Sequence, residues 1–171
     1  MTLMSGLVGP RMLTDYRMAI GLLGASRALR AYYKPRASNA ASRRGLQYEN
    51  RVGKELLRLV TEGHFKRLEH GPWFTFTDVY GLANCSPDFL LWCDQGVVVV
   101  EVKLTWVEVA MHKLNDLYVP VVSLALQQPI ATLVICRNIT ISAPRATFTI
   151  REALTSPTKL LHWPDVGHIL W

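Results

Sequence analysis

The sequence predicts an α/β protein with a mixed central β-sheet flanked by helices. Apolar residues recur at helical spacing before residue 61, and two apolar runs joined by a short turn at 94–96 are typical of a β-hairpin. A further helical stretch and a short buried strand follow the hairpin. Helices before and after a group of strands favour a layered α/β domain.

Length and composition limit the class of protein. The chain has 171 residues, 50% of them hydrophobic, which suits one globular domain with a substantial core. No uninterrupted apolar run reaches about 18 residues, so we expect no membrane span. The three cysteines, Cys85, Cys93 and Cys136, are odd in number and widely spaced. This spacing argues against a disulfide framework, a zinc site and an iron–sulfur cluster, and it favours a reducing, cytosol-like setting.

Positive charge is concentrated at the N-terminus. Residues 1–44 hold eight basic residues and one acid, whereas the remaining residues hold eleven basic and twelve acidic ones. We therefore expect a basic N-terminal arm (1–44) followed by a domain (45–171). The run from Leu13 to Tyr33 predicts a helix, so the arm is expected to be partly helical.

A basic arm favours phosphate contacts. A solvated arm without a function and an organelle transit peptide are the alternatives. The arm residues that we expect to contact nucleic acid are Arg27, Arg30, Lys34, Arg36, Arg43 and Arg44.

The next predicted element is a helix from Ser42 or Arg44 to Val60. Glu49 precedes its apolar residues at helical intervals, so the carboxylate lies on or beside the core-facing stripe. Gly53 follows four residues later and would let another part of the chain approach closely. The alternative is a glutamate at the edge of the stripe that reaches solvent.

The predicted hairpin carries the main candidate site. Its first run is Ser86–Cys93 and its second is Val97–Lys103. With either two-residue turn, Asp88 falls opposite Glu101 or Lys103, and all three charges share one face. A three-residue loop would turn Asp88 away, and we favour the two-residue turns.

Buried carboxylates at the end of an apolar strand need compensation. Two carboxylates that converge on one point suit Mg²⁺, which prefers hard oxygen ligands. The alternative is a pair of solvated strand ends joined by a simple ion pair.

The remaining elements are expected from shorter patterns. We expect a strand or strand pair at 64–80 and a loop at 81–86. A helix, broken or kinked by Pro120, is expected within 107–128. Two short strands, at 131–137 and 146–150, and a helical turn at 151–154 are expected to follow. The apolar tail from Leu160 to Trp171 is expected to pack on the domain, with a partner surface as the alternative.

These residues resemble a known family. Pro87-Asp88, followed after twelve residues by Glu101-Val102-Lys103, resembles the signature of the PD-(D/E)xK nuclease superfamily, and Glu49 on the upstream helix resembles its additional acidic motif. The similarity covers roughly residues 45–137 and is greatest to the phage-nuclease and Holliday-junction-resolvase branches. It implies a restriction-endonuclease-like core.

The resemblance also implies an activity and its residues. Asp88, Glu101 and the Val102 backbone carbonyl would bind Mg²⁺, for which Mn²⁺ could substitute, and Glu49 would hold a metal-linked water or a second metal. Lys103 would orient or help deprotonate the attacking water. The implied catalytic residues are thus Glu49, Asp88, Glu101 and Lys103. The expected reaction is hydrolysis of DNA phosphodiester bonds, as an endonuclease or junction resolvase, without a covalent intermediate.

The resemblance further implies DNA as the partner, a homodimer for resolvase-like members, and the cytoplasm of a prokaryotic or phage-infected cell as the location. Organelle import and a protein partner at the arm or tail are the alternatives. A non-catalytic nucleic-acid-binding or assembly protein is the alternative function.

A few residues beyond the signature are further candidates. RecB-like exonucleases carry a Gln-x-x-x-Tyr motif after the lysine, and here Tyr118 lacks a glutamine at that spacing. His112, Lys113 and Tyr118 could contact DNA, although a solvated helix face is the alternative. His64 and His70 have no carboxylate or cysteine at ligand spacing, so we expect no metal role for them.

Overall fold

A five-stranded mixed sheet forms the centre of the molecule. The computed structural model describes residues 11–12, 17–28 and 39–171. The sheet has, in spatial order, β3 (Arg67–His70), β6 (Phe89–Cys93), β7 (Gly96–Thr105), β8 (Ile130–Asn138) and β9 (Leu160–His162). β3, β6 and β7 are antiparallel, whereas β7, β8 and β9 are parallel. The predicted α/β class with a mixed sheet flanked by helices is confirmed.

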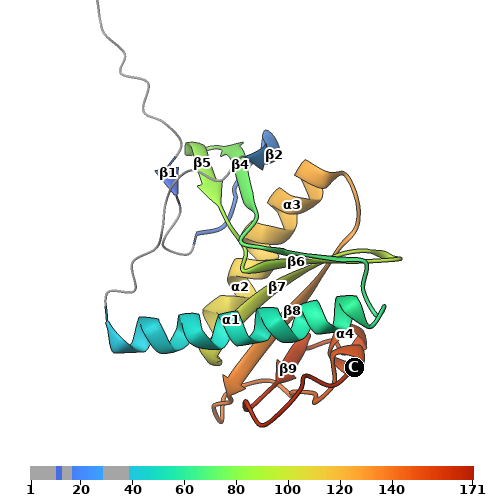
Figure 1. Cartoon of the computed structure of the whole chain (residues 1–171). Helices are drawn as coiled ribbons and strands as arrows, with labels where there is room; N and C mark the ends of the chain where they lie inside the picture. Colours follow the sequence, from blue (N-terminus) through green and yellow to red (C-terminus); the bar gives the residue numbers. More distant parts are fainter. Residues whose placement is uncertain (1–10, 13–16, 29–38) are drawn as a thin grey trace, which may run out of the picture.

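Helices cover both faces of this sheet (Figure 1). One face packs on α1 (Ala40–Thr61), α4 (Ile150–Thr155) and the C-terminal tail. The other face packs on α2 (Glu108–Lys113), the π-helical turn η1 (Leu114–Tyr118) and α3 (Val119–Leu126). None of the helices in the described part of the chain is long and apolar enough to cross a membrane.

The valine run of β7 explains why both faces are covered. Val97 to Val100 are all buried, and alternate residues enter the two cores. Val98, Val100 and Val102 therefore face α1, whereas the odd-numbered positions of β7 face α2, η1 and α3. Glu101 and Lys103 are also at odd-numbered positions, so β7 directs both charged side chains to the face that α2, η1 and α3 cover.

A smaller four-stranded sheet packs beside α3. Its order is β1 (Arg11–Met12), β5 (Gly81–Cys85), β4 (Trp73–Asp78) and β2 (Gly24–Ala28). The predicted loop at 81–86 is wrong, because residues 81–85 form β5. The turn lies earlier: the Tyr80 N–H donates to the Asp78 carboxylate at 3.0 Å, and Gly81 has a φ of 98°.

The predicted helix between Leu13 and Tyr33 is wrong for the residues that the structure describes there. Residues 24–28 form β2, whose pairing with β4 satisfies backbone groups that a helix would have satisfied internally. Arg17 pairs with Asp78 and fixes the segment before β2. The predicted boundary between arm and domain, at 44–45, falls within α1.

Two smaller expectations have different outcomes. The predicted strand at 146–150 is wrong, since only isolated bridges form at Thr147 and Thr149. Thr149 instead caps α4, because its hydroxyl accepts the Glu152 N–H at 3.2 Å. The predicted helical turn at 151–154 is confirmed as part of α4.

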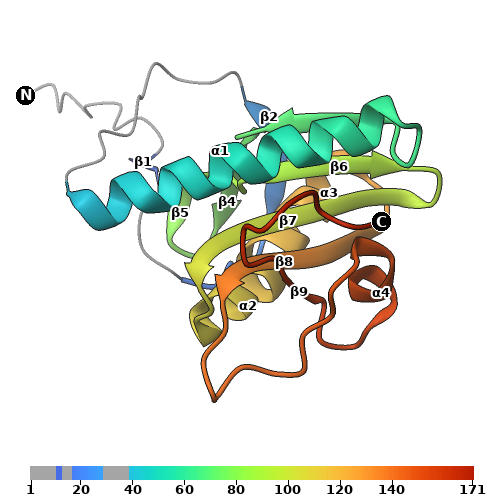
Figure 2. The same cartoon turned by 60° about the horizontal axis from the view of Figure 1, so that its bottom comes forward.

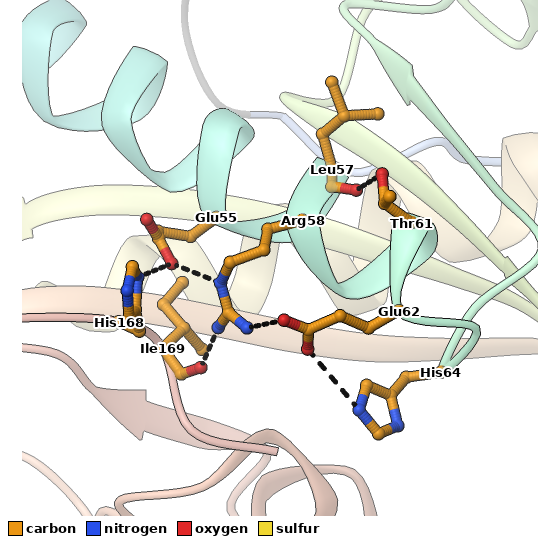
Figure 3. A network of polar contacts seen from close by, with 8 residues as sticks. All are labelled: Glu55, Leu57, Arg58, Thr61, Glu62, His64, His168 and Ile169. Atoms are coloured by element: carbon orange, nitrogen blue, oxygen red, sulfur yellow. Dashed lines mark hydrogen bonds and ion pairs between the residues drawn. The ribbon is translucent and has the colours of Figure 1, made fainter.

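The C-terminal tail packs on the domain, as expected. It runs beside α1 (Figure 2), and the indole of Trp171 contacts the ring of Phe65 with centroids 5.1 Å apart. Arg58 of α1 donates to the Ile169 carbonyl at 2.8 Å and to the carboxylates of Glu55 and Glu62 at 3.0 and 2.5 Å. His168 lies 3.0 Å from Glu55, and Figure 3 shows these contacts together.

Replacing Arg58 should loosen this tail. Arg58→Ala removes three hydrogen bonds, one of them to the tail backbone, so we expect a loss of about 1–2 kcal/mol in the free energy of unfolding. Urea denaturation would measure it. Lys54→Ala, at an exposed position on the same helix, is the control and should change little. Equal stabilities of the two variants would contradict this role.

The same network predicts a pH dependence. Burial raises the pKa of Glu55, but hydrogen bonds from Arg58 and His168 outweigh it, so the pKa is lowered. A lowered carboxyl pKa stabilises the fold above the unfolded-state pKa, and this stability is lost as the pH falls through the folded-state pKa. Acid titration of unfolding should therefore be less steep for Glu55→Gln than for the parent protein. If the free energies of unfolding of Glu55→Gln and of the parent protein changed in parallel with pH, the lowered pKa of Glu55 would be refuted.

Candidate active site

The charged end of the β6–β7 hairpin forms the candidate site. The turn is Asp94–Gln95, and Phe89 pairs with Val100. Asp88, one residue before β6, therefore lies opposite Glu101. This is one of the two registers that the sequence favoured, and the three-residue loop that would turn Asp88 away does not form.

Glu101 is the most deeply buried group of the site. Its side chain is 0% exposed, and its Oε1 atom lies 2.6 Å from the Lys103 ammonium and 3.4 Å from the Lys113 ammonium. Its other oxygen, Oε2, is buried and has no hydrogen-bond partner among the described residues. An unsatisfied buried carboxylate oxygen is costly, so a cation or a hydrogen-bond donor from outside the described residues would stabilise this atom.

Asp88 is fixed through both its backbone and its side chain. The Gly71 N–H donates to its carbonyl at 2.8 Å, and the Val102 N–H donates to its carboxylate at 2.7 Å. The carboxylate thus extends the hydrogen-bond ladder of β6 by one step. Since the N–H and C=O of one strand residue point to the same side, the Val102 carbonyl is directed toward the Asp88 side of β7.

Burial and like charges make ionised Asp88 unfavourable. Burial, followed by the negative charges of Glu101 and Glu49, raises the pKa of Asp88 well above its usual value. The charge of Lys103 and the Val102 hydrogen bond act in the opposite direction but do not cancel this effect. A carboxyl group with a strongly raised pKa next to other carboxylates is typical of functional sites.

Glu49 approaches from α1 and binds His70, for which the sequence predicted no metal role and no carboxylate partner. Its Oε1 atom lies 2.9 Å from Nε2 of His70, at the end of β3. The His70 ring stacks on Phe89, with centroids 4.5 Å apart. Gly53 gives Phe89 its space, because a Cβ at residue 53 would lie 3.0 Å from that ring. Only the register of β3 with β6 could have revealed that His70 lies beside Glu49.

Lys113 and Tyr118 reach the site from the opposite face. The Tyr118 hydroxyl donates to the Ser86 carbonyl at 3.0 Å, so it holds the strand-entry loop that precedes Asp88. Burial, together with the charges of Glu101 and Asp88, raises the Tyr118 pKa well above its usual value, so the hydroxyl keeps its proton. Lys113 lies over the Tyr118 ring, 5.0 Å from its centroid. Both residues therefore contact the candidate site and do not lie on a solvated helix face.

The donor set fits a hard divalent cation in type. Asp88 and Glu101 offer carboxylate oxygens, one of them unsatisfied, and Val102 offers a carbonyl. Glu49 is engaged by His70 instead of facing these two groups. Within the part of the chain that the structure describes, no group of three or more His, Cys, Asp and Glu side chains is arranged to hold a metal ion.

The basic residues expected at nucleic acid lie in several places. Arg27 pairs with Glu69 and lies 5.5 Å above the Phe74 ring, so it joins β2 to β3. Arg43 and Arg44 are exposed on the first turns of α1. Three others lie outside the described residues: Arg30, Lys34 and Arg36.

Comparisons with protein-family models, curated proteins and solved structures find no match. The chemistry of the site therefore rests on its own geometry.

Removing the negative charge at position 88 should stabilise the protein in the absence of divalent ions. A raised carboxyl pKa means that ionisation destabilises the fold as the pH rises through that pKa. Asp88→Asn keeps an oxygen for the Val102 N–H and removes the charge. We expect a gain on the order of 1–2 kcal/mol at neutral pH, measured by denaturant unfolding in EDTA.

Asp94→Asn is the matched control, because Asp94 is exposed in the turn at the other end of the hairpin. It should leave stability nearly unchanged. A lower stability of Asp88→Asn than of the parent protein would show that the charge of Asp88 does not destabilise the fold.

Proposed function

We propose that this protein is a metal-dependent nuclease with a restriction-endonuclease-like core, acting on DNA. The observation that carries the proposal is the placement of Asp88 opposite Glu101, with Lys103 on the same face and an unsatisfied oxygen on Glu101. Structural ion pairs normally satisfy their buried oxygens, and this one does not. The resemblance to the PD-(D/E)xK signature supports the same chemistry.

The proposed reaction is hydrolysis of a phosphodiester. A water oxygen forms a bond to phosphorus, one ester P–O bond breaks, and the leaving oxygen takes up a proton. The products are one phosphate monoester end and one hydroxyl end. A bound Mg²⁺ or Mn²⁺, held by Asp88, Glu101 and the Val102 carbonyl, would lower the pKa of water and neutralise charge on the phosphate.

Lys103 serves as a fixed cation in this proposal. Burial lowers its pKa, but the charges of Glu101 and Asp88 outweigh burial and raise it. The side chain therefore stays protonated at neutral pH, so it donates hydrogen bonds to water and phosphate oxygens. Its charge stabilises the negative charge that develops on the phosphate. The alternative role, as the base that deprotonates water, is disfavoured by the same pKa shift.

Glu49 and His70 stand beside these groups. In the proposed enzyme Glu49 would bind a second cation or a water molecule after leaving His70, and His70 would hold the carboxylate until then. The exposed Arg43 and Arg44, ahead of Glu49 on α1, are suitably charged to contact the nucleic acid backbone.

Cleavage assays test this function directly. The protein would be incubated with Mg²⁺ or Mn²⁺ and with end-labelled single strands, duplexes and four-way junctions. We expect metal-dependent cleavage that falls roughly 10²–10³-fold in Lys103→Ala and in Asp88→Asn. Product lengths would separate internal cuts from trimming of ends.

Asp94→Asn should retain full activity, because it lies at the far end of the hairpin. Binding without cleavage on every substrate would refute the enzyme and favour a non-catalytic nucleic-acid-binding protein.

A further inference from the structure

A second lysine shares the buried carboxylate with Lys103. Lys113 comes from the end of α2 and lies 3.4 Å from Oε1 of Glu101, the same oxygen that Lys103 contacts at 2.6 Å. Both ammonium groups thus gather on one side of Glu101, and Oε2 is left without a partner among the described residues. The Lys113 side chain is 25% exposed, so it also reaches solvent.

The π-helical turn puts Lys113 in this position. In η1 the Val119 N–H bonds to the Leu114 carbonyl, five residues back. Hydrogen bonds of this span widen the turn, so side chains five apart lie closer to one face than they would in a regular α-helix. Lys113 and Tyr118 are five apart, and the ammonium lies 5.0 Å from the ring centroid. A regular α-helix would rotate the two side chains away from each other.

Pro120 gives a physical reason for the wide turn. It has no N–H to donate to the Asp116 carbonyl, and in a regular helix its ring would clash with that carbonyl. The Asp116 carbonyl instead accepts the Ala19 N–H at 2.9 Å. Single π turns inside α-helices are frequent at functional sites.

If the substrate is an anion, the charges of the site favour a second lysine beside Lys103. Asp88 and Glu101 lie with two lysines, Lys103 and Lys113, and Glu49, paired with His70 on the α1 side, adds a third negative charge. One divalent cation brings the ionised groups to a net charge of one positive, which matches the single negative charge of a phosphodiester. Without Lys113 the loaded site would be neutral and would attract the substrate less.

We propose that Lys113 is a phosphate-binding residue that forms, with Lys103, a two-lysine site for the phosphodiester of the substrate. This inference rests on the proposed function. Lys113 is the lysine that exchanges, because its contact with Glu101 is the longer one and it has further N–H groups to donate. The Tyr118 ring, fixed by its hydroxyl to Ser86, keeps the ammonium at the site when it turns from Glu101 to a phosphate oxygen.

The test separates charge from packing at residue 113. Lys113→Met keeps the length of the side chain and removes its charge, and Lys113→Arg keeps the charge. Lys66→Ala is the control, since Lys66 is exposed and pairs with Asp94 at the other end of the hairpin. Binding of a fluorescent DNA oligonucleotide would be measured in EDTA at several salt concentrations, and cleavage in Mg²⁺.

Lys113→Met should bind about 5–10-fold more weakly, with a salt slope lower by about one, as expected for the loss of one phosphate contact. Its KM for cleavage should rise by a similar factor. Lys113→Arg and Lys66→Ala should bind and respond to salt like the parent protein.

The outcomes distinguish the two proposals. If the parent protein cleaves DNA but Lys113→Met keeps its affinity and salt slope, Lys113 does not bind phosphate. The inference also fails if Lys113→Arg loses as much as Lys113→Met, because charge is then not what residue 113 supplies. If the parent protein binds DNA without cleaving any substrate, the nuclease proposal fails, and the salt series in EDTA still decides whether residue 113 contacts phosphate.

Discussion

The two-residue turn at Asp94–Gln95 fixes the pairing of β6 with β7, and the rest of the site depends on that register. A shift by one residue would move every side chain of one strand to the opposite face. Asp88 would then lie opposite a valine, and its carboxylate would point into the core that α1 covers. A shift of β7 would exchange valine for valine along Val97–Val100, but it would turn the charges of Glu101 and Lys103 into the apolar core that α1 covers, which opposes it.

This dependence explains what the sequence could predict. The hairpin, the long helix with Glu49 and the buried strand predicted at 131–137 follow from local periodicity, and all three form, the strand as β8. The common face of Asp88, Glu101 and Lys103 also follows from local rules, since strand alternation and turn length determine it. These features need no knowledge of distant contacts.

Other features depend on partners far away in the chain. Residues 24–28 have no strong strand pattern, and they become a strand because the edge of β4 is open to them. His70 meets Glu49 only because β3 pairs with β6 and α1 lies across both. Lys113 reaches Glu101 through a turn whose width reflects Pro120, a residue that the sequence indicated merely as a helix breaker. Local patterns carry no information about such pairings: the sequence named Lys113 as a candidate but could not predict its contact with Glu101, nor that of His70 with Glu49.

The site also shows how a small fold tolerates buried charge. Placing Glu101 at the end of a valine strand takes the carboxylate out of water, and two lysines compensate at one of its oxygens only. The compensation is incomplete at Oε2 and at Asp88, whose pKa is raised by burial and by neighbouring carboxylates. The surrounding elements are, by contrast, fully packed: the valines of β7 are buried on both faces, and the tail is fastened to α1 by Arg58. Unfavourable electrostatics confined to one edge of a well-packed sheet are expected where a protein binds a cation and an anion together. The cation offsets the negative charge of the carboxylates, and the anion offsets the positive charge of the cation and the lysines.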